Sequence, residues 1–321
     1  MTALFLKVFQ IKHRIRAATA AAVMICLSGI AAVMLFSSVR DGARQDAYAD
    51  VYSGAISGAL PDTSGEVSSA PDAPEPVRLC VVMYHGLIKD SSKQNRYFID
   101  PQYLEDDLRF LTENGYHTIV TKDLTDHFRK GAPLPDKPVM LTFDDGYYNN
   151  YLYAFPLLKK YGCRAVVSPI GQACESAASE EHQDEFYSQC TVDQLKEMHD
   201  SGLVEIAYHT YRLHSLEGGV QGVQKRPDES DKEYVSRLSG DIKSFRECMR
   251  AAAGEDIGCF TYPFGAKSGD TEKIVRAEGF SCALDCEEKI NLLSSAEELY
   301  SVHRFLRDGE RPAEEFFRDK L

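Results

Sequence analysis

The sequence predicts an α/β protein whose strands form a distorted (β/α) barrel, preceded by one transmembrane helix. Three observations support this class. Short apolar runs alternate with helical patterns from residue 79 onward, as is typical of a parallel sheet. The alternation extends over roughly 240 residues, a length that fits a closed barrel better than an open sheet. A stretch without charged residues, 17–39, comes before it.

The uncharged stretch is long enough to cross a bilayer, because about 20 apolar residues span the hydrocarbon core. Basic residues flank its N-terminal side without any acid, which predicts a cytoplasmic tail at 1–16 and a single-pass protein of the cell membrane whose remainder lies outside. Residues 40–77 are rich in small and polar residues and predict a flexible extracytoplasmic linker. The folded domain is then expected at 78–321. A cleaved signal peptide is the alternative, although its apolar core is usually shorter, about 7–15 residues.

Charge is distributed unevenly along the chain. The net charge is −13, yet residues 1–40 contain five basic residues and no acidic one. The rest of the chain is therefore strongly acidic, which argues against nucleic acid as a partner. Tryptophan is absent, whereas there are 17 tyrosines and 16 phenylalanines. Any surface that stacks against sugars would have to use these two residue types.

The predicted strands are short apolar runs, as suits a sheet that is buried on both faces. In chain order they span 79–84, 117–120, 139–143, 165–170, 203–208, 259–263 and 281–284.

The predicted helices are recognised by their start and stop signals. Asp100 and Pro101 open the first helix, whose leucines keep a helical spacing. A capping box begins at Thr191. The predicted helices run from Asp100 to Gly115, over 147–161, from Thr191 to about Gly202, and over 231–253, 272–278 and 312–321. Residues 171–190 and 215–230 are predicted to be polar insertions.

Eight of the nine cysteines follow the apolar stretch. An even number outside the membrane permits disulfides, and Cys174 and Cys190, which bracket an insertion, are the first pair to consider. Buried free thiols are an equally good interpretation, because several cysteines lie in or beside apolar strands.

Two adjacent carboxylates, Asp144 and Asp145, follow the strand at 139–143 and precede Gly146. Barrels place their active sites at the carboxyl ends of strands. Adjacent carboxylates repel each other and are costly to bury, so a metal ion or a shared proton would explain them. The alternative is that one of them caps the following helix.

Two further motifs also follow strands. His209 and His214 come after the strand at 203–208, and paired imidazoles on a turn are good ligands for a metal such as Zn²⁺. The strand at 259–263 ends in the turn Tyr262-Pro263-Phe264-Gly265, which could direct backbone N–H groups into a site. Each motif alone also has a plain structural interpretation, as an incidental pair or an ordinary turn.

Together the motifs TFDDG (142–146), HTxxxH (209–214) and YPFG (262–265) resemble those of the polysaccharide deacetylases, carbohydrate esterase family four. VVMYHGL (81–87) and the segment FIDPQYLEDDLRFLTENGYHTI resemble the branch that contains the poly-N-acetylglucosamine de-N-acetylases. The resemblance covers roughly residues 79–310 and implies the barrel type named above.

The resemblance also implies roles for individual residues. Asp144 would be the general base, and Asp145, His209 and His214 would bind a divalent metal, zinc first and cobalt or nickel as alternatives. The five-residue spacing of the histidines matches the poly-N-acetylglucosamine branch. The backbone N–H of Phe264 would stabilise the oxyanion.

The chain departs from the family pattern at two places. Thr261 stands where many members have an arginine, so the usual support of the base is missing or supplied elsewhere. The late Leu-x-His motif is not clearly present, because the context of His303 predicts a barrel-closing strand. His85 is therefore the better candidate for the general acid or for a residue that orients the site.

These features predict a membrane-anchored, metal-dependent hydrolase that removes N-acetyl groups from an extracellular polysaccharide containing N-acetylglucosamine. One alternative is an O-acetyl esterase or small-amide hydrolase on the same scaffold. The other is an inactive sugar-binding module.

Overall fold

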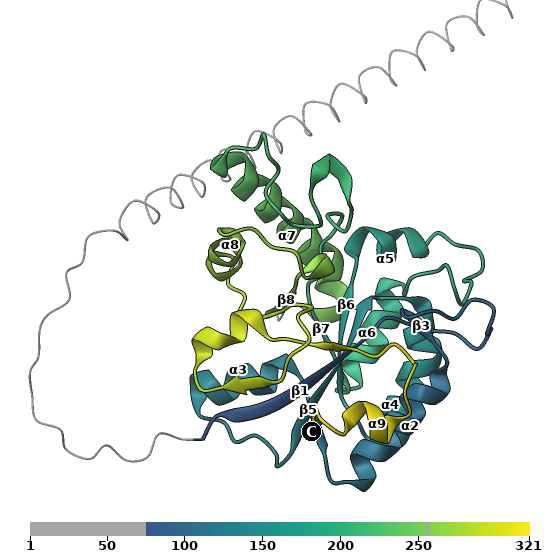
Figure 1. Cartoon of the computed structure of the whole chain (residues 1–321). Helices are drawn as coiled ribbons and strands as arrows, with labels where there is room; N and C mark the ends of the chain where they lie inside the picture. The colour runs from purple at the N-terminus through teal and green to yellow at the C-terminus, as the bar shows by residue number, and fades with distance from the viewer. Residues whose placement is uncertain (1–74, 255–256) are drawn as a thin grey trace, which may run out of the picture. The chain divides into compact units, whose positions relative to one another are not determined.

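The computed structural model describes residues 75–254 and 257–321 (Figure 1). The expected cytoplasmic tail, the expected transmembrane segment 17–39 and all but the end of the expected linker lie outside the described residues. Within the described residues, no helix is both long and apolar enough to span a membrane. The first strand begins at Val77, one residue before the expected start of the folded domain.

The strands follow the predicted order, with additional short strands between them. They are β1 (Val77–Tyr84), β2 (Gly86–Leu87), β3 (Phe98–Ile99), β4 (His117–Ile119), β5 (Pro138–Asp145), β6 (Ala165–Pro169), β7 (Val204–Ile206), β8 (Cys259–Thr261), β9 (Cys282–Leu284), β10 (Asn291–Leu293) and β11 (Phe305–Leu306).

The strands close into a distorted barrel. β1 pairs with β5, β5 with β6 and β6 with β7, all in parallel. Tyr208, beyond the end of β7, bridges to Phe260 in β8, β8 pairs with β9, and Leu284 in β9 bridges to Val302. The chain then enters β11, which pairs in parallel with β1. The ladder returns to its first strand, partly through single bridges, so the predicted α/β barrel is confirmed and the distortion lies where bridges replace strands.

Helices surround this barrel, with α2, α4 and α9 grouped on one side in Figure 1 and α7 and α8 on another. The α-helices are α2 (Pro101–Glu113), α3 (Thr121–Lys130), α4 (Phe155–Tyr161), α5 (Gly171–Ala177), α6 (Val192–Asp200), α7 (Asp231–Ala253), α8 (Thr271–Ala277) and α9 (Ala313–Phe317). A π-helix, η1 (Asn150–Ala154), and the 3₁₀ turns η2 (Glu217–Gly219), η3 (Pro263–Gly265) and η4 (Ala296–Ser301) complete the order.

The residues predicted to cap helices α2 and α6 do so in the structure. The Asp100 side chain accepts a hydrogen bond from the backbone N–H of Gln102 at the start of α2, and Thr191 forms its capping box before α6. Helix α7 occupies the residues expected for it, after a capping box at Ser230. These local hydrogen bonds satisfy helix N–H groups that otherwise have no partner.

Three expectations about helices were wrong. The segment 147–161 does not start as an α-helix: η1 precedes α4, where the Asn149 and Asn150 side chains bind the backbone of Leu87 in β2 and of His85 just before it. Helix α5 occupies the first part of a predicted polar insertion, where Cys174 and Ala177 supply the buried face. Helix α3 was not expected, because few of its residues are apolar.

The eight cysteines in the described part of the chain are free thiols. The Cys174–Cys190 disulfide is therefore absent from the structure. Both side chains are buried, and burial raises the pKa of the Cys190 thiol to about 12. The alternative interpretation, buried thiols in the core, is the one confirmed.

A buried ion pair connects the barrel to α2. Arg307, which follows β11, donates to both carboxylate oxygens of Asp107 in α2, at 2.7 and 3.0 Å. The hydroxyl of Tyr84 in β1 donates to the same carboxylate at 2.7 Å. Because both charged side chains are fully buried, these bonds hold the ends of β1 and β11 against the helix.

Candidate active site

The carboxyl ends of β5 and β7 bring together the three residues expected to bind a metal. Asp145 is the last residue of β5, and His209 and His214 lie on the turn that follows β7. The Nε2 atoms of His209 and His214 lie 3.5 and 3.4 Å from Asp145 Oδ1. One ligand atom from each of the three residues falls within 4.8 Å of the others. The sequence prediction that these side chains converge is confirmed.

The chemistry of this donor set fits a divalent cation. His209 Nδ1 lies 3.0 Å from the backbone carbonyl oxygen of Thr261, so it carries the proton and leaves Nε2 facing Asp145. Asp145 Oδ1 is buried and has no hydrogen-bond partner within the described residues. Burial by itself would raise the pKa of Asp145, but His209 and the neighbouring imidazoles hold it well below its usual range. An ionised, unpartnered oxygen between two imidazole nitrogens is a ligand arrangement that Zn²⁺ commonly uses.

Left-handed backbone places these side chains. Asp145, Thr210 and Phe264 have φ angles of 69°, 74° and 59°, a region that non-glycine residues rarely adopt. Each lies in one of the three motifs, so strained backbone is concentrated at the site. Gly146 continues the turn at φ 74°, and a Cβ atom there would lie 2.6 Å from Pro169 Cβ. Only glycine therefore fits after the two aspartates.

Asp241, a buried residue of α7, holds the turn between the two histidines. Its Oδ1 accepts hydrogen bonds from the Tyr208 hydroxyl at 2.6 Å and the Tyr211 N–H at 2.7 Å. Its Oδ2 accepts from the Arg212 N–H at 3.0 Å. Asp241 gives no signal in the sequence, because an aspartate within an amphipathic helix usually faces solvent.

The expected base, Asp144, does not cap a helix. It forms a two-bonded ion pair with Arg304, at 2.7 Å from Nη1 to Oδ1 and 2.9 Å from Nη2 to Oδ2. Both side chains are almost wholly buried. Burial by itself would raise the pKa of Asp144, but the Arg304 guanidinium outweighs burial and the pKa is lowered. The carboxylate is thus held ionised and in one orientation.

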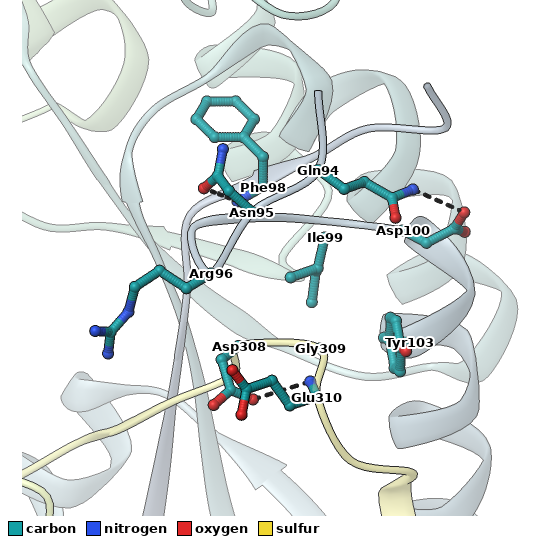
Figure 2. Close-up of a pocket in the computed structure, with 10 residues that line it drawn as sticks. All are labelled: Gln94, Asn95, Arg96, Phe98, Ile99, Asp100, Tyr103, Asp308, Gly309 and Glu310. Carbon is teal, nitrogen blue, oxygen red and sulfur yellow. Dashed lines mark hydrogen bonds between the residues drawn. The ribbon is translucent and has the colours of Figure 1, made fainter. Parts of the chain in front are cut away.

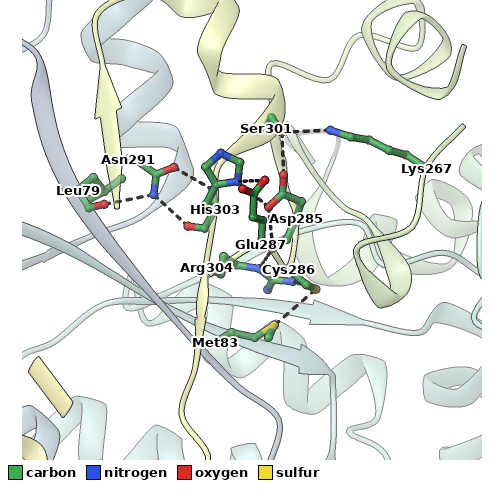
Figure 3. Close-up of polar contacts among 10 residues, drawn as sticks. All are labelled: Leu79, Met83, Lys267, Asp285, Cys286, Glu287, Asn291, Ser301, His303 and Arg304. Carbon is green, nitrogen blue, oxygen red and sulfur yellow. Dashed lines mark hydrogen bonds and ion pairs between the residues drawn. The ribbon is translucent and has the colours of Figure 1, made fainter. Parts of the chain in front are cut away.

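Arg304 supplies the support that Thr261 does not. The Thr261 hydroxyl instead contacts Ser168, at 2.8 Å. Arg304 is itself fixed, because its Nε donates to the carbonyl oxygen of Asp285 at 2.8 Å and its Nη2 lies 3.6 Å from Cys286 Sγ. Figure 3 shows this arrangement around the guanidinium. The sequence predicted a barrel-closing strand from the RFLR context (304–307), where the structure has β11, but the role of the arginine was missed.

His303 belongs to a different group of contacts. Its Nδ1 lies 3.0 Å from Asp285 Oδ1 and 3.7 Å from Glu287 Oε2, and the Ser301 hydroxyl donates to Asp285 Oδ2 at 2.7 Å. Figure 3 shows the His303 ring lying with these carboxylates. The exclusion of His303 as the general acid stays a prediction.

His85 follows β1 at the same end of the barrel. Its Nδ1 is buried without a hydrogen-bond partner in the described structure. Burial lowers the pKa of His85, and it does so although the charges of Asp144 and Asp145 act in the opposite direction. His85 is thus close enough to sense both aspartates, and its role as acid or orienting residue stays a prediction.

Two exposed aromatic side chains lie against histidines of the site. The Phe264 ring lies 4.4 Å from the ring centre of His214 and is 43% exposed. The Tyr97 ring lies 4.9 Å from that of His85 and is 46% exposed. The structure thus brings the Phe264 ring to the site, while the role of its backbone N–H stays a prediction.

Known proteins share both this sequence pattern and this fold. The family model described as polysaccharide deacetylase matches residues 131–283. Poly-β-1,6-N-acetyl-D-glucosamine N-deacetylase of Escherichia coli K12 is 26% identical over 253 residues, which cover 73% of this chain and 37% of that protein. The chain therefore spans little more than a third of the length of this relative.

Solved structures of known proteins have a similar fold. The de-N-acetylase from Aggregatibacter actinomycetemcomitans superposes with a TM-score of 0.65 at 26% identity, covering 76% of this chain and 100% of that one. IcaB from Ammonifex degensii superposes with a TM-score of 0.58 at 28% identity, covering 72% and 91%. The matched family segment contains the two aspartates and both histidines of the site. Residues 131–283 therefore match the polysaccharide deacetylase family, and the candidate metal site lies within that match.

Proposed function

We propose that this protein is a metal-dependent hydrolase that removes N-acetyl groups from a polysaccharide containing N-acetylglucosamine. One observation carries the proposal: the two adjacent aspartates have different partners and can therefore have different roles. Asp144 is bound by Arg304, whereas Asp145 faces His209 and His214 with an unpartnered oxygen. A binding module has no need for this division, but a hydrolase that activates water does.

Asp145, His209 and His214 would hold the cation, which when bound polarises an acetamide carbonyl and lowers the pKa of water. Nitrogen and carboxylate ligands favour zinc, with cobalt and nickel as alternatives. Asp144, kept ionised by Arg304, accepts a proton from the attacking water. Its fixed orientation means that no side-chain freedom is lost at that step.

The backbone N–H of Phe264 donates to the oxyanion as it forms, and His85 donates a proton to the departing amine. Because burial lowers the pKa of His85, its imidazolium donates a proton more readily, but a smaller fraction of it is protonated at neutral pH. The products are acetate and a free glucosamine amine.

The aromatic side chains around the site support a sugar polymer as substrate. Tyr97 and Phe264 expose ring surface beside His85 and His214, and such rings contact sugar faces well because they combine apolar area with little conformational freedom. The E. coli relative is named for β-1,6-linked poly-N-acetyl-D-glucosamine. We extend that substrate class to this chain.

Acetate release tests the proposed activity. Purified full-length protein, stripped of metal and reloaded with Zn²⁺, Co²⁺ or Ni²⁺, is incubated with β-1,6-linked N-acetylglucosamine oligomers, peptidoglycan fragments and O-acetylated oligosaccharides. Metal-dependent release from an N-acetylated glycan is expected. Release from the O-acetylated substrate alone would identify an esterase, and no release from any of them with every metal would contradict the proposed function.

We further propose that residues 17–39 anchor the protein in the cell membrane with the deacetylase domain outside. The apolar length and the basic N-terminal flank support this topology. Intact protein should then fractionate with membranes, and external protease should release the domain by cutting within 41–74. A mature N-terminus near residue 40 would contradict the anchor and identify a cleaved signal.

A further inference from the structure

A cavity of about 290 Å³ lies beside the site, between two loops. One wall is the loop that joins β2 to β3 together with the start of α2, and the other is the loop after β11 (Figure 2). We call it the rim cavity; the lining residues that matter below are Gln94, Arg96, Asp100, Tyr103, Asp308 and Glu310. Its volume is close to the lower end for small-ligand sites, about 300 Å³, as suits a single sugar unit.

The rim cavity lies at the same end of the barrel as the catalytic residues. In the parallel register of β1 and β11, Met83 pairs with Leu306, and the Arg307 N–H donates to the Met83 carbonyl oxygen at 3.0 Å. Continuing that register places Asp308 at the level of His85. The other wall also reaches the site, because the Tyr97 ring contacts the His85 ring. A polymer at the catalytic residues could therefore extend into the cavity.

Both walls are held in place. The loop after β11 begins at Arg307, whose guanidinium is bound twice by the buried Asp107. Gly309 packs so closely that a Cβ atom there would lie 3.0 Å from Ile99 Cγ2. On the opposite wall, Gln94 Nε2 donates to the Ile88 carbonyl oxygen at 3.0 Å. A preformed cavity loses little freedom when a ligand enters it.

The charge of the lining is negative. Three carboxylates, from Asp100, Asp308 and Glu310, line the cavity together with one guanidinium, Arg96. Figure 2 shows Arg96 extending away from the other lining side chains, whereas Asp308 and Glu310 lie side by side. Asp100 is occupied by Gln94 and by its helix cap. Among the described residues, no side chain forms an ion pair with Asp308 or Glu310.

These observations select the ligand. A neutral N-acetylglucosamine gains no charge interaction from two unpaired carboxylates, and an anionic sugar would be repelled. A glucosamine unit carries an ammonium group, and both carboxylates can accept hydrogen bonds from it. Tyr103, partly exposed in the wall, offers ring surface to the sugar.

We propose that the rim cavity binds a protonated glucosamine unit of the polymer that is being deacetylated. This inference rests on the proposed function, because deacetylation creates such units. The protein would then act faster on an N-acetylglucosamine whose neighbour at a fixed distance is already deacetylated. Deacetylated units would be placed in a pattern along the chain rather than at random.

The test compares two substrates within each variant. The first is a β-1,6-linked pentamer of N-acetylglucosamine. The second is the same pentamer with one unit replaced by glucosamine, and it is prepared once for each position of that unit. The ratio of kcat/KM for mixed over fully acetylated pentamer cancels any general loss of activity. For wild type we expect a ratio well above one at one position of the glucosamine. In Asp308→Asn/Glu310→Gln the ratio should fall by about tenfold, the loss expected for a charge-assisted hydrogen bond.

Glu315→Gln is the matched control, since it removes a nearby exposed charge on α9 outside the cavity lining. Its ratio should equal that of wild type. A wild-type ratio of one or less at every position, or a ratio unchanged in the double variant, would overturn the proposal.

A binding measurement separates the proposal from the proposed function. The fully deacetylated glucosamine pentamer should bind wild type in calorimetry and bind the double variant about tenfold more weakly, with affinity that falls as salt rises. Absence of binding, or equal binding to both proteins, would overturn the subsite even where acetate is released. Absence of acetate release with intact binding would contradict the proposed function and support the subsite.

Discussion

Arg304 and Asp144 form a buried ion pair with two parallel hydrogen bonds, although 160 positions separate them in the chain. The pair joins the end of β5 to the segment that closes the barrel beside β1. It thus links barrel closure to the orientation of the proposed base. Because both groups are desolvated, the loss of one leaves the other buried without a counter-charge.

Arg304→Met should therefore destabilise the protein at neutral pH by about 3–5 kcal/mol. The Arg304 guanidinium keeps the pKa of Asp144 below its usual value, so the pair stabilises the fold above the unfolded pKa, about 3.9, and this stabilisation is lost as pH falls through the lowered pKa. In the variant, burial raises the Asp144 pKa instead. The difference in unfolding free energy should be largest near neutral pH and shrink on acidification.

Denaturant unfolding at several pH values measures this difference. Arg311→Met, which removes a partly exposed arginine, is the control and should change stability little. A difference between wild type and Arg304→Met that stays constant from neutral to acidic pH would show that the arginine stabilises by packing alone.

The sequence located most of the site because its signals are local. Asp144 and Asp145 directly follow an apolar strand, and His209 follows another, so strand ends alone bring them together. Arg304 could not be assigned in the same way. Its partner is determined by barrel closure. Thr261 occupies the position where the family usually has this arginine, and nothing near Thr261 in the sequence indicates that Arg304 replaces it.

Some features of the fold escaped prediction for similar reasons. Asp241 lies in a correctly predicted helix, but its three hydrogen bonds reach a turn about 30 residues away, which no periodic pattern encodes. The π-helix begins where Asn149 and Asn150 bind the backbone of Leu87 and His85, after the end of β1. Local sequence rules predict where elements lie, whereas tertiary hydrogen bonds decide these details.

The two aspartates should respond differently to loss of charge. Asp144→Asn keeps the shape but cannot accept a proton, so turnover should fall by at least about 10²-fold while metal content stays near wild type. Asp145→Asn removes an anionic ligand and should lose both metal and turnover. Metal analysis and acetate release on the same preparations measure this, and excess Zn²⁺ should partly restore only Asp145→Asn. The reverse pattern would mean that the two roles are exchanged.

Asp241→Asn tests how the histidines are positioned. The amide NH₂ would replace one carboxylate oxygen, so either the Arg212 N–H or the donors on the other oxygen would meet a donor instead of an acceptor. We expect Zn²⁺ affinity to fall by about 10–100-fold, as when groups that orient metal ligands are lost. Competition with a chelator measures the affinity. Asp231→Asn, at the exposed start of the same helix, should bind Zn²⁺ like wild type, and unchanged affinity in Asp241→Asn would contradict the positioning role.

The last prediction concerns His85 and uses the leaving group. A proton donor is needed when the leaving group is an amine, but much less when it is a nitrophenolate. His85→Gln should therefore lose about 10²–10⁴-fold in deacetylation of an N-acetylglucosamine oligomer and far less on 4-nitrophenyl acetate. Acetate release and nitrophenolate absorbance, measured on one preparation, give the two rates.

The pH dependence of kcat/KM tests the same role of His85 independently. A proton donor must be protonated, and burial lowers the pKa of His85 below its ordinary value, about 6.5. For the amide substrate, wild-type kcat/KM should decline as pH rises through that lowered pKa, and the decline should be absent for the ester and in His85→Gln. Equal losses on both substrates, with the wild-type pH limb retained in the variant, would show that His85 orients the site and that another group donates the proton.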